Sequence, residues 1–212
     1  MFAPLRRLAP AFFAAATAAI SHAAEIAPTA PAKTGLKGPE RTGAPLTRPA
    51  SDEPARAAKL FKVPDGFTVD LFAAEPMLGN PVAICLDNQG RLFVSETYRY
   101  RSSTLDIRHY MFMLEDDLAS RTVEDRVAYM KKNFPGEWQK LGIESEVIRL
   151  VEDRDGDGQA DFSAIYADGF TSLLDGIASG VLAHGGSVWF TNMPSLWKLD
   201  GIDKNGHAEK RE

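Results

Sequence analysis

The sequence has a single cysteine, Cys85, among its 212 residues. One cysteine excludes a disulfide framework and a multi-cysteine zinc site, and a covalently attached c-type haem would need two. The chain also lacks a strong charge of either sign, with 24 Lys and Arg against 29 Asp and Glu. This mildly acidic balance argues against a nucleic-acid-binding protein, which usually shows a basic face.

The first 23 residues have the three-part pattern of a secretory signal peptide. Arg6 and Arg7 precede an uninterrupted apolar run at 11–20, and the small residues of 21–23 (Ser-His-Ala) suit cleavage after Ala23. The alternative, a membrane anchor, is disfavoured because a span needs about 20 apolar residues. The sequence therefore predicts a periplasmic or extracellular protein with no transmembrane helix in the mature chain.

Residues 24–57 are rich in Pro, Ala, Thr, Gly and Lys and show neither helical nor strand periodicity. This composition is typical of a disordered linker. We therefore expect the folded domain to occupy residues 58–212.

Short apolar segments separated by turn residues fill most of the folded domain, which predicts an all-β fold. The expected strands are 67–73, 81–86, 91–96, 147–151, 162–167, 178–183, 187–191 and 196–199. Between the third and fourth of these, Val123, Val127 and Met130 recur at helical spacing, and Thr122 with Asp125 has the spacing of a capping box. An α-helical insert is therefore expected at about 97–144.

An internal repeat relates the strands. Residues 81–96 align with 177–192, and the Asp-Gly segment 155–161 aligns with 203–209. A repeat of about 45–50 residues is typical of one four-stranded blade of a β-propeller, although two hairpins can also match by chance. By this count the chain holds less than two blades, so we predict a partial β-propeller.

The order of antiparallel strands assigns each connection to one end of the sheets. The insert 97–144 shares its end with residues 168–175, while the acidic segment 153–161 and His184 lie at the opposite end. Ligands of propellers commonly lie at the mouth formed by the longer loops, so we expect a site at the end that carries the insert and not at the end that carries His184.

The acidic segment carries four carboxylates spaced around a glycine turn. They are Asp153, Asp155, Asp157 and Asp161. Calcium takes several oxygen ligands, which closely spaced aspartates can supply. Ala164 stands where an EF-hand needs a bidentate Glu, so this is not an EF-hand. The segment is either a shorter, structural calcium site or an acidic turn without a metal.

A second polar cluster follows the strand 91–96 at the end that carries the insert. The candidate residues for binding a polyol or an anionic cofactor are Glu96, Tyr98, Arg99, Arg101 and, at the equivalent position of the second repeat, Asn192. The alternative is a strand end with ordinary ion pairs. The four histidines do not cluster in the sequence, so neither a zinc site nor a Ser/His/Asp triad is expected and no catalytic residue is assigned.

Five segments of the chain are 66–76 (GFTVDLFAAEP), 80–84 (NPVAI), 90–101 (GRLFVSETYRYR), 153–161 (DRDGDGQAD) and 166–170 (YADGF). Together they resemble the N-terminal domain of membrane-bound dehydrogenases of planctomycetes and verrucomicrobia. Those are large secreted proteins that often end in a c-type haem domain. The domain is similar to soluble glucose and sorbosone dehydrogenases, six-bladed propellers that use pyrroloquinoline quinone. The resemblance implies a parent protein that oxidises a sugar or polyol and passes electrons to the quinone or to haem.

The sequence departs from that pattern because it has no Cys-x-x-Cys-His and less than two of the six blades. We therefore expect an N-terminal fragment that is inactive alone, with the remaining blades and the haem domain of a longer parent as its partners. The alternative is a non-enzymatic, calcium-stabilised propeller that binds carbohydrate or protein.

Overall fold

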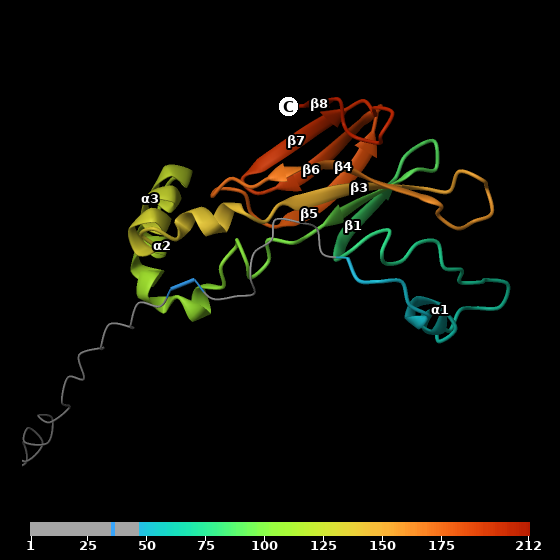
Figure 1. The fold of residues 1–212 in the computed structure, drawn as a ribbon, viewed down its shortest axis with the longest axis horizontal. Coiled ribbons are helices and arrows are strands. Elements are labelled where there is room, and N and C mark those ends of the chain that lie inside the picture. Colours follow the sequence, from blue (N-terminus) through green and yellow to red (C-terminus); the bar gives the residue numbers. More distant parts are fainter. Residues whose placement is uncertain (1–34, 37–46) are drawn as a thin grey trace, which may run out of the picture. The chain divides into compact units, whose positions relative to one another are not determined.

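The computed structural model describes residues 35–36 and 47–212 (Figure 1). Its contacts separate a unit Met1–Pro31 from a unit Ala32–Glu212, and everything below concerns the second unit. The expected signal peptide and most of the expected linker lie outside the described residues. Helix α1 (Glu53–Ala58) spans the last residues of the expected linker.

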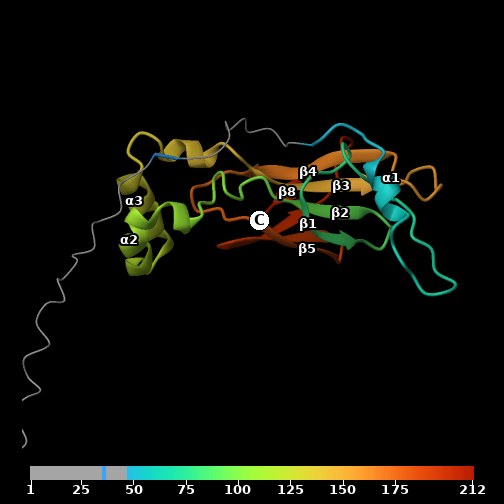
Figure 2. The ribbon, with the colours of Figure 1, turned by 90° about the horizontal axis from the view of Figure 1, so that it is seen from below.

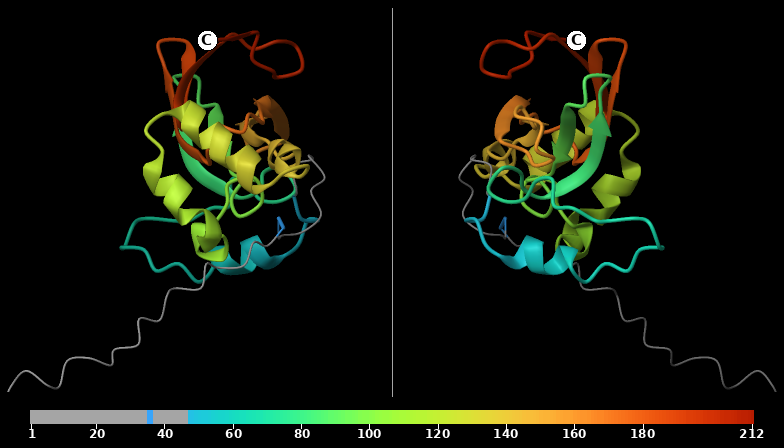
Figure 3. Two further views of the ribbon diagram at one scale, coloured as in Figure 1. Left: turned by 90° about the vertical axis from the view of Figure 1, so that its left-hand side faces the viewer. Right: turned by 90° about the vertical axis from the view of Figure 1, so that its right-hand side faces the viewer.

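The described chain is mostly β and forms two four-stranded antiparallel sheets, which confirms the β-rich part of the prediction. The count of less than two four-stranded units is wrong, because the short β8 completes the second sheet. The first sheet contains, in order, β1 (Pro81–Leu86), β2 (Leu92–Glu96), β3 (Glu146–Glu152) and β4 (Phe162–Phe170). The second contains β5 (Ala178–His184), β6 (Ser187–Asn192), β7 (Ser195–Asp200) and β8 (Lys210–Arg211). The last residue, Glu212, exchanges two main-chain hydrogen bonds with Lys198 of β7, and the C-terminus lies at this edge of the second sheet (Figures 1 and 3).

The connection between β2 and β3 is helical, as expected. It contains η1 (Ile107–His109), η2 (Met111–Met113), α2 (Leu114–Ala119), α3 (Val123–Asn133) and η3 (Trp138–Gly142). The predicted capping box is present: the Thr122 hydroxyl accepts from the Asp125 N–H, and the Asp125 carboxylate accepts from the Thr122 N–H. None of the helices within the described residues has the length and hydropathy that crossing a bilayer requires.

The two sheets face each other across one apolar core. Side chains alternate between the two faces of a strand, so every second residue of each strand points into this core. Phe93 of β2 and Leu150 of β3 are directly paired and pack with Val188 and Phe190 of β6. The opposite, outer face of the first sheet carries Leu92, Val94 and Val151.

Residues 67–73 do not form the expected strand. Phe67 is exposed, and the segment pairs with no strand among the described residues. Its later part instead lies across the outer face of the first sheet, where Phe72 packs near Val94 and the Phe72 carbonyl accepts from the Ala160 N–H. Local β propensity predicted a strand here, but a strand also needs a neighbour with which to exchange hydrogen bonds.

The two ends of the sheets carry different connections, as the strand order predicted. Helices α2 and α3 lie at one end (Figures 1 and 2). At the same end Arg99, which follows β2, donates to the carbonyl of Ser172 in the β4–β5 connection. The acidic segment 153–161 and the turns of the β1–β2 and β5–β6 hairpins lie at the other end.

Candidate functional site

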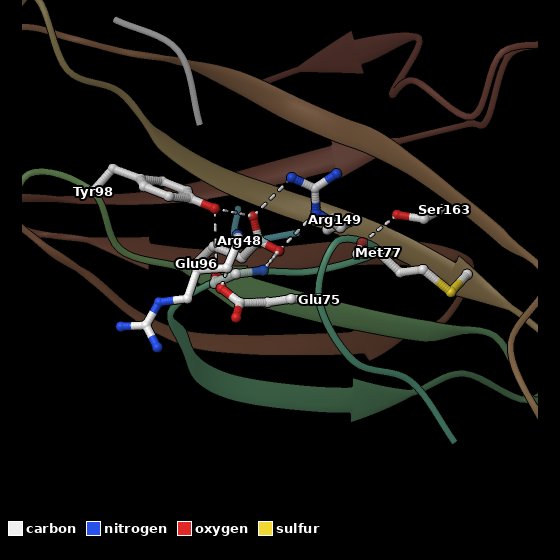
Figure 4. Close-up of polar contacts among 8 residues, drawn as sticks. Arg48, Glu75, Met77, Glu96, Tyr98, Arg149 and Ser163 are labelled. Carbon is white, nitrogen blue, oxygen red and sulfur yellow. Dashed lines mark hydrogen bonds and ion pairs between the residues drawn. The ribbon is translucent and has the colours of Figure 1, made fainter. Parts of the chain in front are cut away.

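Glu96, the last residue of β2, lies fully buried in a network of hydrogen bonds (Figure 4). Arg149 of β3 forms a two-pronged ion pair with it, at 2.7 Å from Nε to Oε1 and 3.0 Å from Nη2 to Oε2. The Tyr98 hydroxyl donates to Oε2 at 2.9 Å, and the Gly79 N–H donates to Oε1 at 2.9 Å. All of these contacts come from within the chain, so the carboxylate holds β2, β3 and the segment before β1 together.

The network also changes the ionisation of the groups around Glu96. Burial, followed by the negative charge of Glu96, raises the pKa of Tyr98 well above its ordinary value. Burial lowers the pKa of Arg149, but the hydrogen bonds and charge of Glu96 outweigh it and raise that pKa overall. Tyr98 is therefore a neutral donor and Arg149 a permanent cation.

Arg99 is fully buried and fastens the insert to the sheets. Its two Nη atoms donate to the main-chain carbonyls of Glu144 (2.7 Å), Phe170 (3.3 Å), Ser172 (2.9 Å) and Asp175 (3.1 Å). These four bonds use the four Nη hydrogens of the guanidinium. Burial lowers the pKa of Arg99 despite the nearby carboxylates.

Glu146, the first residue of β3, is a buried acceptor that the sequence analysis did not select. Its Oε1 accepts from the Thr97 hydroxyl (3.2 Å) and from the N–H groups of Tyr98 (3.2 Å) and Arg99 (2.6 Å), while Oε2 accepts from the Ala178 N–H at 2.8 Å. Burial raises its pKa, although these donors act in the opposite direction. The available signal was an acidic residue at the start of a mostly apolar strand.

Asn192 has the same local role in the second sheet that Glu96 has in the first. It is buried at the end of β6, and its Nδ2 donates to the Gly176 carbonyl at 3.2 Å, shortly before β5. Glu96 likewise bonds Gly79, shortly before β1. The aligned positions therefore perform equivalent structural tasks, but the structure does not bring Asn192 into the Glu96 network.

Arg101 lies apart from this network. It is exposed, has a left-handed backbone with φ of 61°, and its guanidinium carbon lies 5.2 Å from the centre of the Tyr100 ring. Of the five candidate residues, the structure joins Glu96 to Tyr98, and places Arg99 beside them through the shared acceptor Glu146.

This arrangement does not fit a bound anionic quinone. Recognition of its carboxylates would need arginine forks that are free to turn toward a ligand. Arg149 is paired with Glu96, and Arg99 is committed to four carbonyls. The cluster is a structural joint between the insert and the two sheets, and we derive no chemical step through a quinone or haem from it.

The acidic segment at the other end keeps three of its four aspartates together. Asp153, Asp155 and Asp157 each place a carboxylate oxygen within 4.8 Å of the others. Hydrogen bonds from Gly158 and then Gly156 to Asp153 hold its pKa below the ordinary value. Asp161 lies outside this group and accepts from the Arg154 N–H at 3.0 Å. The three carboxylates match the oxygen ligands that calcium takes, so the donor set fits that ion.

A hollow of about 390 Å³ lies between the turns of the β1–β2 and β5–β6 hairpins. Its wall includes Asp87, Asn88, Gln89, Arg91, Phe93, Tyr166, His184 and Ser187. Within the part of the chain that the structure describes, the side chains of Asn88, Gln89 and His184 have no hydrogen-bond partner. All three side chains are exposed to solvent, so their donors and acceptors are within reach of a ligand in the hollow.

The charged part of this wall is organised by the β1–β2 turn itself. The Asp87 carboxylate accepts from Arg91 Nε at 2.7 Å and from the N–H groups of Gln89 and Arg91. Burial raises the pKa of Asp87, but these bonds outweigh it and lower the pKa below its ordinary value. The internal repeat aligns the two turns, and that alignment was the signal that they lie at the same end of neighbouring sheets.

Comparison with known protein families gives the following result. A family described as a domain of unknown function, DUF7133, matches residues 53–212. The chain belongs to the DUF7133 family. No curated protein and no solved structure matches it.

The DUF7133 region begins at the first residue of α1 and includes both sheets and the helical insert. All the candidate residues discussed above, in the Glu96 network, the acidic segment and the hollow, fall inside it. The description of the family names no activity, so the resemblance to dehydrogenases enters below as part of a proposal.

Proposed function

We propose that the DUF7133 region is a non-enzymatic binding module of a secreted, propeller-type protein, and that it takes a sugar or polyol in the hollow between the two hairpin turns. The observation that carries this proposal is the set of unengaged polar side chains, Asn88, Gln89 and His184, around one hollow. The Glu96 cluster is less suited to a ligand because its polar groups already bond one another.

The chemistry of the wall supports a ligand rich in hydroxyl groups. A hydroxyl donates one hydrogen bond and accepts others, so it is matched by planar side chains that carry both kinds of group. The amides of Asn88 and Gln89 and the imidazole of His184 supply such a set. A volume of about 390 Å³ lies at the small end of the usual range for ligand pockets.

The propeller part of the proposal rests on the repeat. Two antiparallel sheets of four strands stack face to face, and each uses the last residue of its second strand to bond the chain before its first strand. Stacked sheets of this kind bury their faces against neighbouring repeats. Oxidation of a sugar or polyol, with electrons passing to a quinone or c-type haem, belongs in this proposal to other parts of a longer parent.

A calcium ion at Asp153, Asp155 and Asp157 would have a structural role in this module. The three carboxylates converge on a hairpin connection at the same end as the hollow. A bound cation would offset their mutual repulsion and rigidify that connection.

Isothermal titration calorimetry of the purified chain against a hexose, a hexitol and glycerol tests the binding function. We expect saturable heats with at least one of them, and at least a tenfold loss of affinity in the double variant N88A/H184A. His207, an exposed histidine of another turn outside the hollow, gives the matched control H207A, which should bind like the wild type. Absence of binding to all three ligands would overturn the proposal.

A further inference from the structure

The outer face of the second sheet carries an exposed apolar patch. Leu182 of β5 is 54% exposed and Leu196 of β7 is 60% exposed. Together with Trp189 and Thr191 of β6 they line an open, mostly apolar depression of about 360 Å³. This face does not touch the first sheet, because Val188 and Phe190, on the other side of β6, make that contact.

The strand register shows which residues of the first sheet correspond to this face. Leu182 is paired with Trp189 just as Cys85 is paired with Phe93, and Leu196 is paired with Thr191 just as Ile148 is paired with Ser95. In the first sheet these positions form the buried face that packs on the second sheet, and Phe93 and Ile148 are almost fully buried there. The outer face of the second sheet therefore repeats a face that is buried elsewhere in the same chain.

The complementary face is exposed as well. On the outer side of the first sheet, Ile84 is 65% exposed and Leu86 is 61% exposed. Ile84 is paired with Val94 as Val181 is paired with Phe190, and Leu86 is paired with Leu92 as Ala183 is paired with Val188. Val181 and Ala183 pack in the core between the sheets.

The segment before β1 covers only part of that outer face. Phe72 and Leu78 pack near Leu92 and Val94 of β2. Strand β1, with Ile84 and Leu86, remains accessible beside it. Within the chain, the contact between the sheets uses β5, the first strand of the second sheet, against β1 and β2. Strand β1 is the first strand of its own sheet, so in an equivalent contact it takes the place of β5.

We propose that the outer face of the second sheet, at Leu182, Trp189 and Leu196, binds β1 on the outer face of the first sheet in a second copy of this chain. The contact repeats the sheet-to-sheet packing already present within each chain. The two surfaces are different, so the association is head-to-tail and builds a ring if the rotation closes or an open chain if it does not. Because neither surface includes the hollow between the hairpin turns, this assembly is independent of the proposed ligand.

Sedimentation velocity and light scattering of the purified chain, at concentrations up to about 100 μM, test the assembly. We expect the mass of the wild type to rise above that of a monomer with concentration. The variants L182K/L196K and I84K/L86K, each lacking one surface, should each remain monomeric. Leu118 of α2, 71% exposed and far from both surfaces in sequence, gives the control L118K, which should assemble like the wild type.

Mixing the two double variants distinguishes head-to-tail contact from other modes. Each retains the surface that the other lacks, so the mixture should form a one-to-one heterodimer and nothing larger. A dimer formed by I84K/L86K alone would show contact between identical faces and would overturn the proposal. A wild type that stays monomeric throughout would also overturn it, and would leave a further repeat of the longer parent as the occupant of the exposed face. If a lysine variant fails to fold, as judged by its thermal melt, the serine versions L182S/L196S and I84S/L86S replace it.

Discussion

Arg149 Nε lies 2.7 Å from Glu96 Oε1, and this buried ion pair joins β2 to β3 beneath the segment that precedes β1. Replacement of Glu96 by Gln leaves the Arg149 guanidinium buried without a charged partner, and replacement of Arg149 by Met does the same to the Glu96 carboxylate. Breaking such a pair costs about 3–5 kcal/mol. Chemical denaturation should show this loss in the free energy of unfolding for each single variant.

A surface ion pair provides the matched control. Lys132 and Asp116 lie at 2.7 Å on the helical insert, with the lysine exposed. K132A should cost less than about 1 kcal/mol, because exposed pairs contribute little. Equal losses for R149M and K132A would contradict the structural role given to the Glu96 network.

Arg99 should control how firmly the insert is held. A lysine at this position keeps the charge but cannot bond four carbonyls at once, so R99K should destabilise the chain by about 2–4 kcal/mol. Limited proteolysis should then cut residues 103–142 faster, while hydrogen exchange of β6 stays slow. R101K, at the exposed neighbouring arginine, should leave both measurements unchanged, and a similar effect of the two variants would argue against the assigned contacts.

Calcium should raise the melting temperature of the chain. A ligand at about 100 times its Kd stabilises the folded state by about 2.7 kcal/mol. D153N should remove the effect, because Asp153 belongs to the convergent group. Asp203 accepts N–H bonds within its own turn but belongs to no such group among the described residues, so D203N is the control. Identical melts in calcium and in chelator would exclude an occupied site.

The Tyr166 hydroxyl should lose its proton only at high pH, and the free energy of unfolding should fall as it does. Burial, with smaller contributions from Asp200 and Glu209, raises its pKa to about 12, and its hydroxyl donates to the Gly201 carbonyl at 3.0 Å. The folded pKa lies above the unfolded value of about 10, so the neutral phenol is favoured in the fold. Its stabilisation is complete below pH 10 and is lost as the pH rises through about 12. Phenolate absorbance during an alkaline titration of the wild type and of Y166F checks this. Y166F should lack the absorbance step near pH 12, and loss of a step near pH 10 instead would contradict the account.

The elements that the sequence predicted best are those set by neighbouring residues. The capping box at Thr122 and Asp125 and the β1–β2 hairpin depend on spacings of a few residues, and both are present. Residues 67–73 show the limit of such reasoning. Their β propensity is local, but whether they form a strand depends on a partner elsewhere, and the segment lies over a sheet face instead.

The candidate site depends on longer-range register and was correspondingly harder to predict. The polar character of Glu96, Tyr98 and Arg99 was visible in the sequence. Their partners were not, because Arg149 and Glu146 follow a long helical insert, and the strand order alone does not give the residue-by-residue register across it. The hollow between the hairpins likewise appears only when two turns almost 100 residues apart are placed side by side.

The central claim is that ligand binds at the hairpin turns and not at the Glu96 cluster. A titration of the isotope-labelled chain with a hexose or hexitol, followed by amide chemical shifts in NMR spectra, tests this most directly. Our account predicts saturable shifts for residues 87–91 and 184–187, with residues 96–101 unchanged. Shifts concentrated at residues 96–101, or no shift with any of the ligands, would contradict it.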